Sequence, residues 1–164
     1  MRHVRRSELI LSASLVSLAT VWVLSSPTDQ LLYNHTPSVP VGLYLRSNRA
    51  IERGVFVTVR AVDVAPDLAA LRNYDGPRNR FIKRVSATAG DEVCAEHETL
   101  FINGERRATR LSADRTGRAL SWWNECRVLG SEEVLLLGDT EDSFDGRYWG
   151  PIDRSLVEGV WRRL

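Results

Sequence analysis

The side chain with the most distinctive chemistry in this chain is a single lysine. Among 22 basic residues, Lys83 is the one lysine and all the others are arginine. A desolvated amine can lose its proton near neutral pH, whereas a guanidinium cannot. Because Lys83 lies within the strand-like apolar run 81–85, we expect it to be buried and to serve as a general base. An exposed lysine paired with a carboxylate on a strand face is the alternative.

The candidate nucleophile is Ser38, which lies between Pro37 and Pro40. The prolines restrict the backbone and hold the serine at a fixed angle, as a nucleophile requires. A neutral lysine within hydrogen-bond reach can activate such a hydroxyl without any histidine. Thr36 offers a second hydroxyl, which could bind an oxyanion together with the backbone N–H of Ser38. Ordinary turn chemistry is the alternative for a serine in this setting.

Other catalytic arrangements have weaker support in the sequence. The three histidines, His3, His35 and His97, are scattered and form neither a triad nor a metal-binding motif. Asp139, Asp142 and Asp145 crowd one turn-rich stretch, which favours a solvated loop over a pair of catalytic acids. We therefore predict no metal and no cofactor.

The composition is that of one globular domain behind a hydrophobic segment. The chain has 164 residues, 43% hydrophobic and 26% charged, with a net charge of +1, which favours a single core and argues against a nucleic-acid partner. An uncharged run, 9–24, follows Arg2, Arg5 and Arg6, so its N-terminal end should face the cytoplasm. The run is short for a bilayer span of about 20 residues and also fits a signal peptide. A helix of a soluble core is a third alternative.

We favour an anchor, because no clean cleavage site follows the run. The expected organisation is a cytoplasmic basic leader at 1–7, a transmembrane anchor or signal segment at 8–26, and a periplasmic catalytic domain at 27–164. In an oxidising compartment Cys94 and Cys126 would form a disulfide. Two unpaired buried thiols are the alternative.

The domain itself is predicted to be mainly β and antiparallel. Three prolines between residues 25 and 40 indicate a loop that is neither strand nor helix. Short apolar runs predict strands at 41–45, 55–59, 81–85, 92–96, 134–138 and 159–164. Asn103-Gly104 predicts a type I′ hairpin between 99–102 and 105–108. A helix is expected at 66–74, and the polar stretch 109–131 could form a lobe closed by the disulfide.

Three segments, in this order, resemble the characteristic boxes of type I signal peptidases. They are NHTPSVPVGLYL at 34–45, RFIKRVSATAGDEV at 80–93 and GDTEDSFDGRYWGPI at 138–152. The first lacks the Ser-Met pair of ordinary leader peptidases and is similar to the Asn-x-Thr-x-Ser-x-Pro-x-Gly-x-Tyr form of the TraF-type maturation peptidases of conjugative plasmids. The resemblance covers roughly residues 31–162. It implies a signal-peptidase-like (LexA-like) antiparallel β fold.

The resemblance also implies roles for individual residues. Ser38 would attack the scissile carbonyl, Lys83 would take its proton, and Ser143 would orient the Lys83 amine. Asp145 and Arg147 match the positions of a structural salt bridge. The chain departs from leader peptidases between these two residues, where Gly146 stands in place of the usual serine. The segment from Gly-Asp to Ser143 is also one residue shorter.

The activity implied is that of a membrane-anchored serine endopeptidase that cleaves, and by hypothesis cyclises, an exported pilin-like precursor for conjugative transfer. Such enzymes bind the peptide as an added strand, here beside 34–37 and 80–82. The expected partners are a pilin or secreted-protein precursor, the cytoplasmic (inner) membrane and proteins of the transfer apparatus. The alternatives are a general leader peptidase, a self-cleaving LexA-like domain and a catalytically silent periplasmic scaffold of a secretion apparatus.

Overall fold

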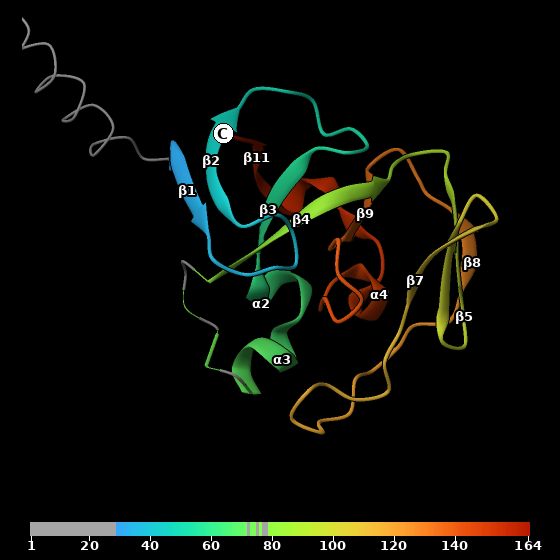
Figure 1. The fold of residues 1–164 in the computed structure, drawn as a ribbon. Coiled ribbons are helices and arrows are strands. Elements are labelled where there is room, and N and C mark those ends of the chain that lie inside the picture. Colours follow the sequence, from blue (N-terminus) through green and yellow to red (C-terminus); the bar gives the residue numbers. More distant parts are fainter. Residues whose placement is uncertain (1–28, 72, 75, 77–78) are drawn as a thin grey trace, which may run out of the picture.

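The computed structural model describes residues 29–71, 73–74, 76 and 79–164. Their strands form two sheets (Figure 1), a seven-stranded sheet in the order β1-β2-β11-β3-β4-β9-β10 and a four-stranded sheet in the order β7-β6-β5-β8. Neighbouring strands in both sheets run antiparallel throughout the described part of the chain. The predicted fold class, mainly β and antiparallel, is therefore confirmed.

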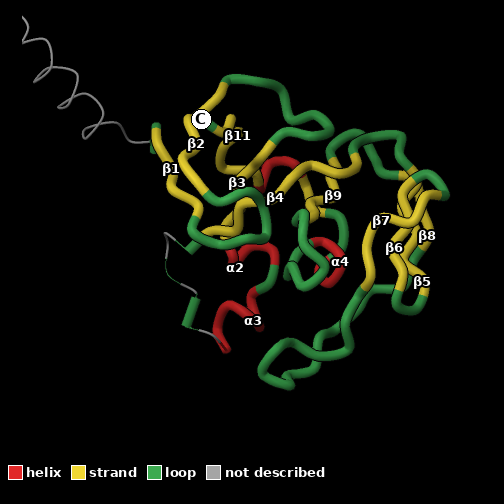
Figure 2. Tube along the Cα trace, viewed as in Figure 1, coloured by secondary structure: helices red, strands yellow, loops and turns green. Residues whose placement is uncertain are grey.

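The strands of the larger sheet are β1 (Leu31–Asn34), β2 (Gly42–Ser47), β3 (Phe56–Arg60), β4 (Arg80–Ala87), β9 (Glu133–Leu137), β10 (Ile152–Asp153) and β11 (Val157–Arg163). Those of the smaller sheet are β5 (Glu92–Glu96), β6 (Thr99–Ile102), β7 (Glu105–Thr109) and β8 (Cys126–Val128). The helices are short: α2 (Ala61–Val64), α3 (Pro66–Leu71), α4 (Gly146–Trp149) and the 3₁₀ turn η1 (Arg154–Leu156). Figure 2 shows α4 between the two groups of strands.

Strand β11 joins the two parts of the larger sheet that carry the candidate catalytic residues. Ser38 lies in the loop of the β1–β2 hairpin, and β2 pairs on its other side with β11. Strand β11 also pairs with β3, which pairs with β4, where Val57 faces Lys83. The position of Ser38 relative to Lys83 therefore depends on β11.

A small hydrophobic cluster reinforces this connection. It consists of the buried side chains of Val39, Tyr44, Ile82 and Trp161. Val39 follows Ser38 and Ile82 precedes Lys83 in the chain. The Trp161 indole N–H, from β11, donates a buried hydrogen bond to the Thr58 hydroxyl at 3.0 Å. This cluster thus holds the backbone next to both Ser38 and Lys83.

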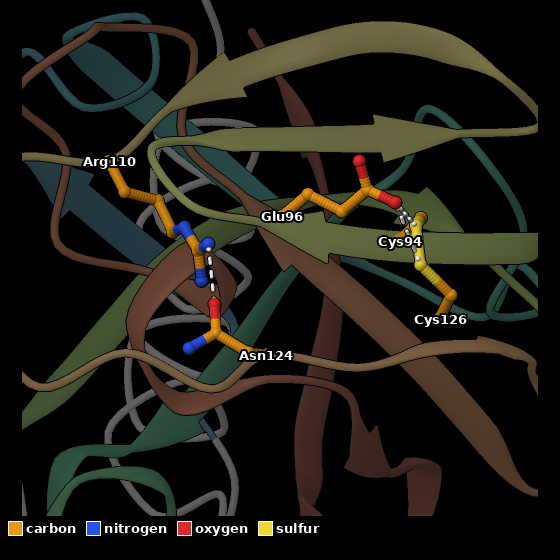
Figure 3. The surroundings of a disulfide bond; sticks show 5 residues. All are labelled: Cys94, Glu96, Arg110, Asn124 and Cys126. Atoms are coloured by element: carbon orange, nitrogen blue, oxygen red, sulfur yellow. Dashed lines mark hydrogen bonds between the residues drawn. A yellow bond between two sulfur atoms is a disulfide. The ribbon is translucent and has the colours of Figure 1, made fainter.

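The smaller sheet is held by a tight turn and a disulfide. Asn103 and Gly104 both have positive φ, 52° and 77°, as the predicted type I′ hairpin requires. Cys94 of β5 and Cys126 of β8 face each other across the ladder and form a disulfide (Figure 3). In the same view Arg110 donates to the side chain of Asn124, at 3.1 Å, which ties the end of β7 to the segment before β8.

The predicted strands and the predicted helix 66–74 are present, most of them with shifted ends, whereas 92–96 and 99–102 keep their predicted bounds. The helix α3 ends at Leu71, short of the predicted limit at residue 74. The prediction that 25–40 contains no strand is wrong, because Leu31–Asn34 forms β1 at the sheet edge. Its four residues precede the prolines of the loop, and an edge strand needs only one paired side. The polar stretch 109–131 contains β8 and an isolated bridge between Ala113 and Ala119.

The predicted leader and the hydrophobic segment, 1–26, lie outside the described residues. Among the residues that are described, no helix is both long enough and apolar enough to cross a membrane.

Candidate active site

Lys83 is buried at the centre of the candidate site. It is 4% exposed on β4, and its Nζ donates to the Ser143 hydroxyl at 3.0 Å. The prediction of burial is therefore confirmed, and the alternative of an exposed surface lysine is wrong. Desolvation lowers the pKa of Lys83 from the ordinary 10.5 to about 8, although the nearby Asp145 carboxylate opposes this change. A large fraction of this amine is thus unprotonated in mildly alkaline solution.

The Ser38 loop is organised by a residue that sequence reasoning did not single out. Asn34, 4% exposed, places its amide nitrogen within hydrogen-bond distance of the carbonyls of Thr36, Val39 and Pro40. Its side-chain oxygen accepts from the Thr36 backbone N–H at 3.1 Å. A sequence signal existed, since asparagine commonly bonds the backbone two residues further on.

A backbone hydrogen bond and a close approach at Gly138 hold Ser38 against the turn that carries Ser143. The Asp139 N–H donates to the Ser38 carbonyl at 2.6 Å. A Cβ placed on Gly138 would lie 2.7 Å from that carbonyl and 2.1 Å from the Ser143 hydroxyl oxygen. Only glycine at position 138 lets the two serine-bearing segments approach this closely.

Ser38 and Lys83 line the same cavity, with a volume of about 440 Å³. Its other walls come from β1, from the start of β4, from α3 and from Phe144. The structure thus brings together the nucleophile and base suggested by the sequence, and it places the edge segments 34–36 and 80–82 along the same cavity.

The Thr36 hydroxyl donates to the Asn34 side-chain oxygen at 3.0 Å. Its single proton is committed to that bond, so Thr36 can bind an oxyanion only after its hydroxyl rotates.

Asp145 and Arg147 form a buried ion pair, with Nε 2.8 Å from the carboxylate. The Arg147 guanidinium also donates to the backbone carbonyls of Thr140 and Glu141, at 3.1 and 2.6 Å. The Asp145 carboxylate accepts from the Gly138 N–H at 2.7 Å. The pair therefore holds the 138–145 turn closed, and Ser143 with it.

The glycine between these two residues has a steric reason. A Cβ on Gly146 would lie 2.6 Å from the Leu136 carbonyl oxygen and 2.8 Å from a Leu135 methyl group. The serine that leader peptidases usually carry here would not fit at this contact between α4 and β9.

One group of three candidate metal ligands exists among the described residues: Cys94, Glu96 and Cys126. Both sulfurs are occupied by the disulfide, so the group does not form a metal site.

Comparisons with known proteins define the class. The chain belongs to the signal peptidase family, peptidase S26, whose family model matches residues 3–163. Membership implies a serine peptidase, and it confirms the resemblance drawn from the three sequence boxes.

Two relatives narrow the comparison further. Both are plasmid transfer proteins TraF from Escherichia coli, 39% identical over 141 residues and 36% identical over 140 residues. Each alignment covers 79% of this chain and 79% of the relative. The crystal structure of a signal peptidase I from Enterococcus faecalis V583 aligns with a TM-score of 0.40 and 21% identity, covering 70% of this chain and 98% of that one.

Proposed function

We propose that this protein is a membrane-anchored serine endopeptidase in which Ser38 is the nucleophile and Lys83 is the general base. The observation that carries the proposal is the buried amine of Lys83, hydrogen-bonded to Ser143 and lining one cavity with Ser38. Burying an amine lowers the free energy of unfolding. Side chains with a strongly shifted pKa that line a cavity are therefore candidates for a functional role.

The chemistry follows from this arrangement. The neutral Lys83 amine accepts the Ser38 hydroxyl proton as Oγ attacks the scissile carbonyl. The backbone N–H of Ser38 and the rotated Thr36 hydroxyl are the candidate donors to the oxyanion. The resulting ammonium then gives its proton to the departing amine, which leaves an ester on Ser38. Ser143 accepts a hydrogen bond from Nζ and so positions it throughout the cycle.

The segment of substrate before the scissile bond would lie extended in the cavity shared by Ser38 and Lys83. Leu32–Asn34 of β1 and Arg80–Lys83 of β4 both line this cavity. A peptide between them could pair with strand backbone, as in β-augmentation.

The substrate we propose is an exported pilin-like precursor, processed at the outer face of the cytoplasmic membrane by the periplasmic domain 27–164. The support is the similarity to two plasmid transfer proteins and the basic leader before the hydrophobic run. Cyclisation has a physical route, since a tethered amine at an effective molarity of about 10⁵ M can compete with water for the ester.

The proposal is tested by co-expressing the full chain with candidate pilin precursors. We expect wild type to process the precursor, and we expect Lys83→Arg and Ser38→Ala to leave it intact, because a guanidinium stays protonated. Arg107→Lys, on the exposed strand β7, is the matched control and should process normally. Equal processing with both mutants and in cells that lack the chain would show that another enzyme cleaves the precursor, which favours the silent scaffold. Processing of unrelated secretory precursors would favour a general leader peptidase.

Mass spectrometry of the mature product tests ring closure separately. A product lighter than the linear cleaved chain by one water supports cyclisation, and the linear mass rejects it.

A further inference from the structure

Ser38 also lines a second cavity, which Lys83 does not line. Its volume is about 450 Å³. Its walls come from three segments: residues 36–38 of the serine loop, the loop between 111 and 120, and the 140–148 region. The two cavities share Thr36, Ser38 and Phe144. They therefore meet at the nucleophile.

The two cavities are lined mainly by different segments of the chain. Strands β1 and β4, which would hold the peptide before the scissile bond, line the first cavity, whereas the loop 111–120 lines the second. An endopeptidase must accommodate chain on both sides of the bond that it cuts. We infer that the second cavity binds the residue that follows the scissile bond and selects an apolar side chain there. This inference rests on the proposed function.

The chemistry of the walls supports an apolar preference. Leu111, Leu120, Phe144 and Tyr148 contribute carbon surface to the cavity. Leu111 is 42% exposed, an unfavourable state for leucine that a bound apolar side chain would relieve.

Leu111 is also held rigidly. Its backbone N–H donates to the Tyr148 hydroxyl at 3.0 Å, and its carbonyl accepts from the Trp122 indole N–H at 3.0 Å. The side chains of Tyr148, from α4, and Trp122 thus fix the backbone of the leucine that lines the cavity. Little conformational entropy would be lost when a substrate binds, so discrimination can be strong.

The far end of the loop is pinned as well. Arg115, in this loop, forms an ion pair with Asp142, in the turn that carries Ser143. The Leu120 N–H donates to the Ser112 carbonyl at 3.0 Å, which closes the base of the loop. Figure 1 shows this loop extending from the smaller sheet past α4. The wall is therefore formed before any substrate arrives.

The experiment uses the detergent-solubilised full chain and two kinds of probe. One is a set of peptides with identical alanine-rich segments before the bond and Leu, Ser or Asp after it. The other is a 4-methylumbelliferyl ester of the same segment, which has no residue beyond the bond. The readout is the ratio of kcat/KM values for the Leu and Ser peptides, since one apolar side chain in a pocket changes kcat/KM by roughly 10- to 200-fold.

We expect wild type to prefer the Leu peptide by at least about 10-fold, and Leu111→Ser to bring the ratio close to one. The matched control is Leu164→Ser. Leu164 is 62% exposed and its backbone N–H bonds the Leu43 carbonyl of β2, so this variant should keep the wild-type ratio. If Leu111→Ser fails to hydrolyse the ester, Leu120→Ser tests the same wall from the other end of the loop.

The outcomes separate the two proposals. Absence of Ser38-dependent ester hydrolysis by wild type overturns the proposed function. Ester hydrolysis with equal rates on all three peptides, or a leucine preference that survives in Leu111→Ser, overturns the assignment of the second cavity and leaves the proposed function standing.

Discussion

At the scale of the single residue, the site depends on an amine that the fold keeps out of water. The buried Lys83 amine donates a hydrogen bond to the Ser143 hydroxyl. Arginine satisfies every other basic position, but it could not take a proton here.

The rate of cleavage should follow the titration of this amine. Desolvation sets the pKa of Lys83 at about 8, so the protonated, inactive form dominates below that pH and the free base above it. We expect kcat/KM to rise tenfold per pH unit below pH 7 and to level off above pH 9. Stopped assays on one peptide across pH 6–10 check this.

Ser143→Ala serves as the control. It removes the acceptor that stabilises the ammonium, so its midpoint should move to lower pH. A profile unchanged in this variant would mean that another group is titrating.

The same burial should cost stability. Below pH 8 Lys83 is protonated in both the folded and unfolded states, and burying the ammonium costs about 3 kcal/mol at pH 7. Lys83→Met removes this cost and loses about 1 kcal/mol of hydrogen bonding to Ser143. We therefore expect an inactive variant that is about 2 kcal/mol more stable at pH 7. Urea unfolding measures the difference.

The pH dependence of that difference gives a stricter test. The folded protein releases the proton near pH 8 and the unfolded chain near 10.5. Wild-type stability should therefore rise over that interval relative to Lys83→Met, and the advantage of the variant should disappear by about pH 10.5. A constant gap at all pH values would contradict the burial argument.

At the scale of the element, the central question is how two strands from distant parts of the chain hold Ser38 near Lys83. The Trp161 side chain of β11 packs with Val39 and Ile82, the neighbours of the two reactive residues. Its indole is 2% exposed and bonds Thr58.

Trp161→Ala should lower the free energy of unfolding by about 3–5 kcal/mol, the usual cost of removing a buried aromatic ring. It should also lower kcat at temperatures where the variant is still folded, because Val39 loses a packing partner next to Ser38. Trp161→Phe is the matched variant. It keeps a ring but loses the donor to Thr58, so about 1 kcal/mol should be lost. Full kcat in folded Trp161→Ala would show that the cluster does not position the serine.

The elements also show where sequence reasoning succeeds and where it stops. Lys83 stands out in the sequence as the one lysine, and Ser38 stands out through the resemblance of 34–45 to a signal-peptidase box. Most strands are predictable because their apolar periodicity is local. Strand β1 was missed because the prolines that follow it dominate the pattern. The role of Asn34 and the second cavity depend on contacts between distant segments, such as Leu111 with Tyr148, which periodicity does not encode.

At the scale of the whole molecule, the two sheets differ in how they are secured. The smaller sheet shares a hydrophobic cluster with Ala87, Leu135 and Leu137 of the larger sheet, and it also carries the Cys94–Cys126 disulfide, which spans 32 positions of sequence. Its loop 111–120 lines a cavity with Ser38, whereas the disulfide lies beside the exposed Glu96.

Replacing both cysteines with alanine should therefore separate stability from catalysis. The chain-entropy estimate for a loop of this length is about 3–4 kcal/mol of lost stability. Activity on the ester probe at 25 °C should stay close to wild type, because the larger sheet carries Ser38 and Lys83. Thermal unfolding followed by circular dichroism measures the first quantity. A large fall in ester hydrolysis by the folded variant would show instead that the smaller sheet shapes the reactive centre.

The placement of β11 between β2 and β3 has a consequence for biogenesis. Arg46 of β2 donates a hydrogen bond to the Glu158 carbonyl of β11, which lies 112 positions further along the chain. Pairings between such distant segments form late in folding. Until β11 is made and inserted, the hairpin with Ser38 has no ladder to the strands with Lys83. On the proposed function, we therefore expect proteolytic competence only once β11 has paired with both β2 and β3.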